Sequence, residues 1–147
     1  MTTIAYKDGI LASDGLISNA QGIVSGKMCK VAEGRTIIGG AAGTLGDVVA
    51  FLEWVKKHDG SLQKRPKFEG GLSGLIIYSD GSLFFIDDNF TAAPAGVKIA
   101  ALGSGIELAL GAMAAGASAE QAVAIACELD TNSAQPVSFV SLKGLDK

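Results

Sequence analysis

Short apolar segments, separated by turns that contain glycine, dominate the first part of the chain. Residues 2–6 and 10–13 flank Lys7-Asp8-Gly9, and an Asp-Gly pair between apolar runs is typical of a tight β-hairpin. The same criteria predict further strands over residues 16–24, 27–32, 36–40, 72–78, 82–86, 97–102 and 136–142. We expect the first two of these to pair with each other, and the hairpin connections to make the sheets largely antiparallel.

Apolar residues recur at helical spacing in three segments. The apolar face predicted for residues 45–57 consists of Leu45, Val48, Val49, Leu52 and Val55. Two more helices are predicted over residues 104–114 and 118–129. The second begins with Ser118 and has Gln121 three residues later, which is a capping-box pattern.

The order of these elements is strands, helix, strands, two helices and a closing strand, and it predicts an α+β fold. Two antiparallel sheets cannot bury this much apolar surface alone, so helices should cover their outer faces. We therefore expect a four-layer αββα sandwich, formed as one domain over residues 1–147.

Composition excludes several classes of protein. The chain has 147 residues, of which 48% are hydrophobic, and a net charge of −3, so it fits a compact domain without a nucleic-acid footprint. Neither a membrane-spanning run nor a signal peptide is recognisable, and we expect a cytoplasmic protein without a membrane partner. Cys29 and Cys127 do not suggest a disulfide framework.

His58 is the single histidine of the chain, and it lies just beyond a predicted helix. A Ser-His-Asp or Cys-His arrangement would have to use it, and a histidine-based zinc site is equally disfavoured. The sequence therefore predicts no metal and no cofactor. Any hydrolase built on this chain needs a different general base.

The candidate for that base lies at the amino terminus. If Met1 is removed, Thr2 carries a nucleophilic hydroxyl and a free α-amine on the same residue. An α-amine titrates near about pH 8 and can accept the hydroxyl proton. Many proteins begin with Met-Thr for no catalytic reason, so Thr2 needs support from the rest of the chain.

That support comes from motifs in chain order, namely Thr2-Thr3-Ile4, Leu11-Ala12-Ser13-Asp14-Gly15, Ala42-Gly43, Gly103-Ser104-Gly105 and Asp130-Thr131-Asn132-Ser133. On these residues the chain resembles the N-terminal-nucleophile (Ntn) hydrolases of the proteasome β-subunit class, especially the HslV-type peptidase. The resemblance runs nearly end to end. It implies a threonine peptidase that hydrolyses peptides or unfolded proteins.

The first site residues have a chemical reason as well as a family match. Thr2 would attack the substrate, and a nearby cation would keep its α-amine neutral. Lys30, expected mid-strand, is the candidate cation. Asp14 precedes it by sixteen residues and is its expected partner.

The other roles follow from the resemblance. Gly43 would supply the oxyanion-hole amide, Ser104 would lie beside the α-amine, and Asp130 with Ser133 would orient the nucleophile. Two further residues would contact substrate. Ser18 would pair with the peptide main chain, and Ala41 would line a roomy pocket for the residue that precedes the scissile bond.

Departures from the family concern its outer layer and its partners. Polar residues 59–70 stand where relatives carry much of a helix, so one helical layer is expected to be truncated. The resemblance implies a homo-oligomeric ring, whereas docking of an ATPase partner is left open by the missing helix.

Two alternatives remain. A non-catalytic relative would keep the fold as an assembly or binding module. A nucleotide-binding loop at residues 40–46 fits neither the dinucleotide pattern nor the phosphate-loop pattern.

Overall fold

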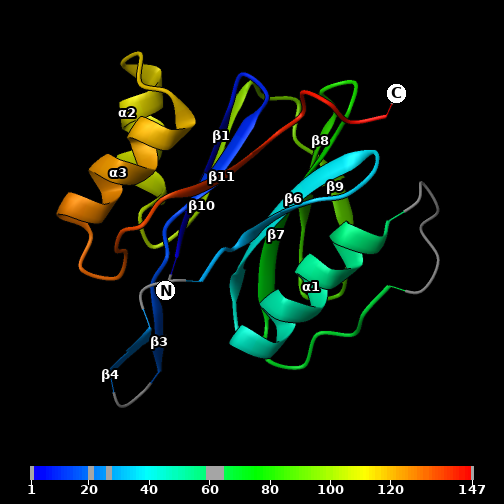
Figure 1. The fold of residues 1–147 in the computed structure, drawn as a ribbon, viewed down its shortest axis with the longest axis horizontal. Helices are drawn as coiled ribbons and strands as arrows, with labels where there is room; N and C mark the ends of the chain where they lie inside the picture. The colour runs from blue at the N-terminus through cyan, green and yellow to red at the C-terminus, as the bar shows by residue number, and fades with distance from the viewer. Residues whose placement is uncertain (1, 20–21, 26–27, 59–64, 147) are drawn as a thin grey trace.

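The computed structural model describes residues 2–19, 22–25, 28–58 and 65–146. Within these residues the elements stack in four layers (Figure 1). A pair of helices covers a four-stranded sheet, a five-stranded sheet packs behind it, and a single helix covers the far side. The α+β class and the layered arrangement of two antiparallel sheets agree with the sequence-based expectation.

The first sheet holds the amino-terminal strand in its interior. Its strands, in the order β10-β1-β2-β11, are β10 (Ile99–Gly103), β1 (Thr3–Lys7), β2 (Ile10–Ser13) and β11 (Ser138–Ser141). All pairings are antiparallel. The predicted hairpin between β1 and β2 is confirmed. Its turn residues Asp8 and Gly9 both have positive φ, as tight hairpin turns require.

The second sheet is longer and includes one strand that the sequence did not reveal. Its order is β5 (Val31–Glu33), β6 (Ile37–Gly43), β7 (Leu72–Tyr78), β8 (Leu83–Ile86) and β9 (Ala92–Pro94). The short strand β9 was missed because its Ala-Ala-Pro sequence has weak strand propensity. Its place at the sheet edge explains how proline is tolerated there.

The predicted pairing of residues 16–24 with 27–32 is wrong. Instead, β3 (Ile17–Asn19) and β4 (Gly22–Ser25) form a hairpin of their own, which projects from the body of the sandwich (Figure 1). The following strand, β5, pairs with β6. Lys30 therefore lies just before β5 and not in the middle of a strand.

Three helices lie within the described residues, α1 (Leu45–Lys57), α2 (Ile106–Ala114) and α3 (Ala119–Leu129). The capping box at Ser118 is confirmed, because its side chain accepts from the Gln121 amide and the Gln121 side chain accepts from the Ser118 amide. In the part of the chain that the structure describes, no helix has the length and apolar character needed to span a bilayer.

The buried face of α1 differs from the predicted one. Val48, Leu52 and Val55 are buried, as expected, whereas Leu45 and Val49 are 48% and 45% exposed. The helix is rotated so that Phe51 and Trp54 face the sheet. Aromatic side chains bury more area than valine or leucine, and their burial outweighs a simple count of apolar positions.

Three apolar clusters fill the three interfaces between layers. Alternation along β1 divides its side chains, because Ile4 and Tyr6 join the cluster between the sheets while Ala5 faces α2 and α3. Ala12 and Ala101 flank Ala5 on the neighbouring strands, and these small side chains let the helices approach closely. The single helix α1 covers the second sheet over a cluster centred on Phe51.

Half of the predicted loop at residues 59–70 lies outside the described residues.

Candidate active site

The start of β1 lies where the β10–α2 turn and the segment between α3 and β11 meet it. Thr2 is 6% exposed and Thr3 is fully buried. Buried polar side chains lie here, so each of them needs a hydrogen-bond partner. The structure supplies those partners from segments that are far apart in the chain.

The peptide unit between Thr2 and Thr3 is held from both of its polar ends. Its carbonyl oxygen, on Thr2, accepts a hydrogen bond from the Ser104 amide at 2.8 Å. Its N–H, on Thr3, donates to Oδ1 of Asp14 at 3.0 Å. The close approach requires glycine at Gly103, since a Cβ there would lie 1.7 Å from the Thr2 oxygen. The plane of the peptide that begins at Thr2 is therefore fixed.

Asp14 is the anchor of the first cluster. It is fully buried, and Lys30 donates from Nζ to the same oxygen, Oδ1, at 3.0 Å. The amides of Leu16 and Ala134 donate to Oδ2, each at 3.2 Å. Four donors thus satisfy a carboxylate that burial alone would disfavour. The expected Asp14–Lys30 pair is present.

Burial governs the charge on Lys30, whose side chain is only 3% exposed. Desolvation lowers the pKa of the Lys30 ammonium below its ordinary value, although the charge of Asp14 and the hydrogen bond to it act in the opposite direction. The backbone also holds this residue. Its amide donates to Oγ of Ser13 at 3.4 Å, and its carbonyl accepts from the Ala41 amide at 3.3 Å.

Asp130, at the carboxyl end of α3, is the anchor of the second cluster. Its Oδ2 accepts from Ser104 Oγ at 2.6 Å and from Ser133 Oγ at 2.7 Å, and its Oδ1 accepts from the Asn132 amide at 3.2 Å. Partial burial raises the pKa of the Asp130 carboxyl, but these hydrogen bonds outweigh burial and hold it below its ordinary value. The structure therefore brings Ser104, Asp130 and Ser133 together.

Thr3 joins the two clusters, and its side chain was not among the predicted site residues. Its amide donates a hydrogen bond to Asp14, and its Oγ1 lies 2.7 Å from Ser133 Oγ. Ser13, which holds the Lys30 amide, was also missed. The available signal was a hydroxyl residue on each of two neighbouring strands of an apolar hairpin.

The predicted substrate-contacting residues belong to β6 and β3. Gly43 ends β6, is exposed, and has φ +146°, a conformation that favours glycine. A Cβ at Gly43 would lie 2.4 Å from the Gly71 carbonyl oxygen. Ala41 is fully buried in the cluster beneath α1 and presents no surface to a substrate. Ser18 lies on β3, and its side chain is outside the described part of the structure.

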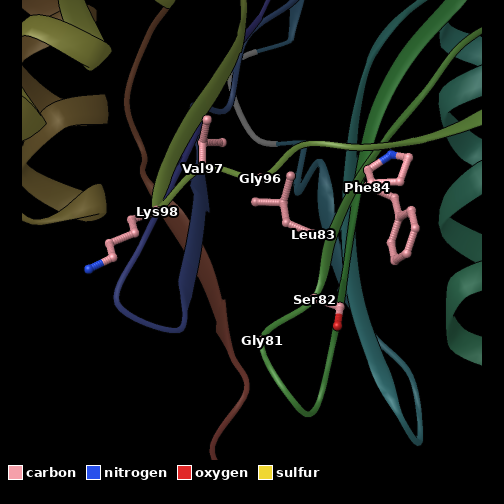
Figure 2. Close-up of a pocket in the computed structure, with 8 residues that line it drawn as sticks. Gly81, Ser82, Leu83, Phe84, Gly96, Val97 and Lys98 are labelled. Carbon is pink, nitrogen blue, oxygen red and sulfur yellow. The ribbon is translucent and has the colours of Figure 1, made fainter.

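A separate pocket of about 370 Å³ lies between the β7–β8 turn and the β9–β10 connection (Figure 2). Leu83, Phe84 and Val97 line it, and Lys98 is the charged residue among its lining residues. The Lys98 side chain points away from Leu83 and Phe84 (Figure 2). None of the predicted site residues contributes to this pocket. The described residues also contain no cluster of side chains suited to holding a metal ion.

Comparison with known proteins gives relatives by structure alone. No family model and no curated protein sequence matches the chain. Among solved structures, Thiobacillus denitrificans BPH in complex with epoxomicin superposes with a TM-score of 0.69 at 22% identity, covering 97% of this chain and 98% of that chain. A second structure of Thiobacillus denitrificans BPH gives a TM-score of 0.65 at 20% identity, with the same coverage. The likeness establishes the fold alone.

Proposed function

We propose that this chain is an Ntn hydrolase of the proteasome β-subunit type, which hydrolyses peptide bonds with Thr2 as the nucleophile. One observation carries the proposal. The Thr2–Thr3 peptide is held between a buried Asp14–Lys30 pair and the Ser104 amide, and Ser104 belongs to the Asp130 cluster. A structural hairpin strand has no need for two carboxylates and a buried cation at its first residues.

The proposed reaction is an acyl transfer in two steps. After removal of Met1, the α-amine of Thr2 takes the proton from Oγ1, which attacks the carbonyl carbon of the substrate peptide bond. The C–N bond breaks as the amine returns that proton to the leaving nitrogen, and an ester on Thr2 remains. Water then attacks the ester, gives up a proton to the amine, and releases the carboxylate product while Oγ1 is protonated again.

Two groups support the charged species in this scheme. The Lys30 ammonium and the Thr3 amide donate to the same oxygen of Asp14. At this position the positive charge of Lys30 favours a neutral α-amine and a developing alkoxide on Thr2. The amide of Gly43 would donate to the oxyanion. Its exposed position and glycine-only backbone leave room for a substrate to approach the main chain.

The surface beside Gly43 suggests which peptides are favoured. Leu45 and Val49, one turn apart on α1, expose apolar side chains directly after Gly43. The two therefore offer a contact that buried Ala41 does not. We expect a preference for an apolar residue before the scissile bond, because burial of its side chain is worth about 1.5–3 kcal/mol.

The epoxomicin complex of the Thiobacillus denitrificans structure supplies a probe. Epoxomicin is an epoxyketone, and a residue that carries both a hydroxyl and an α-amine can react with both electrophilic carbons. We expect intact-mass measurement of the purified protein to show loss of Met1 and a one-to-one adduct after incubation with epoxomicin.

Thr2→Ala is the decisive variant, because it keeps the α-amine and removes the hydroxyl. It should fold normally, form no adduct and cleave no peptide. A wild-type protein that has lost Met1 and still forms no adduct would argue for the non-catalytic assembly module. Wild-type activity in Thr2→Ala would reject the nucleophile.

A homo-oligomeric ring remains part of this proposal. Mass measurement of the native assembly by light scattering tests it, and a monomer under conditions of peptide cleavage would contradict it. An ATPase partner stays open, and a change in cleavage rate on addition of an ATPase and ATP would be its test.

A further inference from the structure

Thr3 contacts both carboxylate clusters of the candidate site, although it is neither the proposed nucleophile nor an ionisable residue. It is fully buried. Its amide donates to Asp14 Oδ1 at 3.0 Å, and its carbonyl accepts from the Asp14 amide at 3.1 Å. Its side-chain oxygen lies 2.7 Å from Ser133 Oγ. Thr3 thus links the two clusters through hydrogen bonds made by its main chain and its side chain.

The direction of the hydrogen bonds in the second cluster follows from counting protons. An ionised carboxylate only accepts, and the lowered pKa of Asp130 keeps it ionised at neutral pH. Ser133 therefore gives its one hydroxyl proton to Asp130. The contact between Ser133 and Thr3 then has a single solution, in which Thr3 donates to Ser133. The chain of donors runs from Thr3 through Ser133 to Asp130.

The surroundings hold the Thr3 hydroxyl in this arrangement. A Cβ at Gly105 would lie 2.1 Å from Thr3 Oγ1 and 3.1 Å from its Cγ2, so the turn after β10 closes tightly over the side chain. Because Thr2 and Thr3 share one peptide plane, a rotation of Thr3 also moves Thr2. The hydroxyl of Thr3 can therefore control the position of the proposed nucleophile without touching the substrate.

A simpler explanation is that Thr3 is a buried hydroxyl that merely needs a partner. Thr36 provides the comparison within the same chain. Its Oγ1 is buried, and it has no hydrogen-bond partner among the described residues. The fold therefore tolerates an unpartnered threonine hydroxyl elsewhere, whereas Thr3 is connected to two carboxylates at the start of β1.

We propose that Thr3 is a positioning residue. The hydrogen bonds from its hydroxyl to Ser133 and from its amide to Asp14 hold the Thr2 nucleophile in place between the two clusters. This inference rests on the proposed function, since a positioning role needs a reacting group to position. It assigns a role to a residue that makes no contact with the reacting atoms.

Thr3→Val tests the inference, because valine keeps the shape of threonine and removes only the hydroxyl. We expect kcat for an apolar peptide, and the rate of epoxomicin adduct formation, to fall about 10-fold to 100-fold, as displaced nucleophiles do. KM should stay unchanged. Thr3→Ser restores the donor, so it should recover most of the lost rate. Thr36→Val is the matched control, with an unchanged rate and an equal or higher unfolding temperature.

The outcomes separate this inference from the proposed function. An inactive wild-type protein that forms no adduct overturns both. An active wild type with full activity in Thr3→Val overturns the positioning role alone, as does a Thr3→Ser variant that is no faster than Thr3→Val. If Thr3→Val fails to fold, the comparison of Thr3→Ser with Ser133→Ala decides. The inference requires Thr3→Ser to be active and Ser133→Ala to show the rate loss, about 10-fold to 100-fold, that is expected when the Thr3–Ser133 hydrogen bond is removed.

Discussion

Asp14 and Asp130 are the centres of two clusters that meet at Thr3, and the protein stabilises the two carboxylates by different means. Asp14 is fully buried and is neutralised by the Lys30 ammonium together with backbone amides. Asp130 lies at a helix end nearer to solvent and is held by two neutral hydroxyls and one amide. The first arrangement places a charge beside Thr2, and the second places an ordered set of donors there.

The difference matters because the cost of an unpaired charge depends on burial. A buried carboxylate that loses its cation retains the full desolvation penalty, whereas water can replace a lost partner at a helix end. Substitution of Asp14 or Lys30 should therefore lower both the free energy of unfolding and the rate of the proposed reaction. Asp130 should affect chemistry more than stability.

The largest expected effect comes from breaking the buried pair. Lys30→Met removes the cation and leaves Asp14 charged and buried, so we expect the free energy of unfolding to fall by about 3–5 kcal/mol and peptide cleavage to be abolished. Denaturant titration and a peptide assay measure the two effects. Lys56→Met is the matched control, because its partner Glu53 is 51% exposed and Lys56 itself 56% exposed. Equal losses of unfolding free energy in Lys30→Met and Lys56→Met would contradict the expected difference between a buried and an exposed ion pair.

A smaller effect on stability is expected at Asp130. Asp130→Asn should lower the free energy of unfolding by about 1–2 kcal/mol at neutral pH, since charged hydrogen bonds become neutral ones. Because the native pKa of Asp130 lies below its ordinary value, its contribution is present above about pH 4 and is lost as the pH falls through the native pKa. The stability difference between wild type and variant should therefore shrink as the pH falls below about 4. A difference that grew on acidification would have the wrong sign.

The smallest effect is expected for an ion pair that is exposed to solvent. Arg35 donates from Nε to Asp146 at 2.7 Å, with 71% and 59% of the two side chains exposed. Arg35→Ala should change the free energy of unfolding by less than about 1 kcal/mol and leave cleavage unaffected. Denaturant titration at low and high salt checks this. A loss comparable to that of Lys30→Met would mean that burial does not explain the difference between the clusters.

Much of this site was predictable one residue at a time. Asp14 and Lys30 were expected as partners on chemical grounds, whereas the family resemblance grouped Ser104, Asp130 and Ser133 around Thr2. Thr3 was not, since a threonine beside a candidate nucleophile looks like any strand residue. Ala41 shows the opposite error, where a residue expected at a substrate pocket is fully buried under α1.

The amino-acid sequence by itself determined what depends on neighbours in the chain. The hairpin turn at Asp8-Gly9, the bounds of α1 and the capping box at Ser118 follow from local conformational preference and hydrogen bonding. Tertiary structure alone decided which face α1 buries. It also decided the contact of Thr3 with Ser133, which are 130 positions apart. Such contacts depend on how whole layers pack, because area buried between distant segments outweighs the pattern within any one of them.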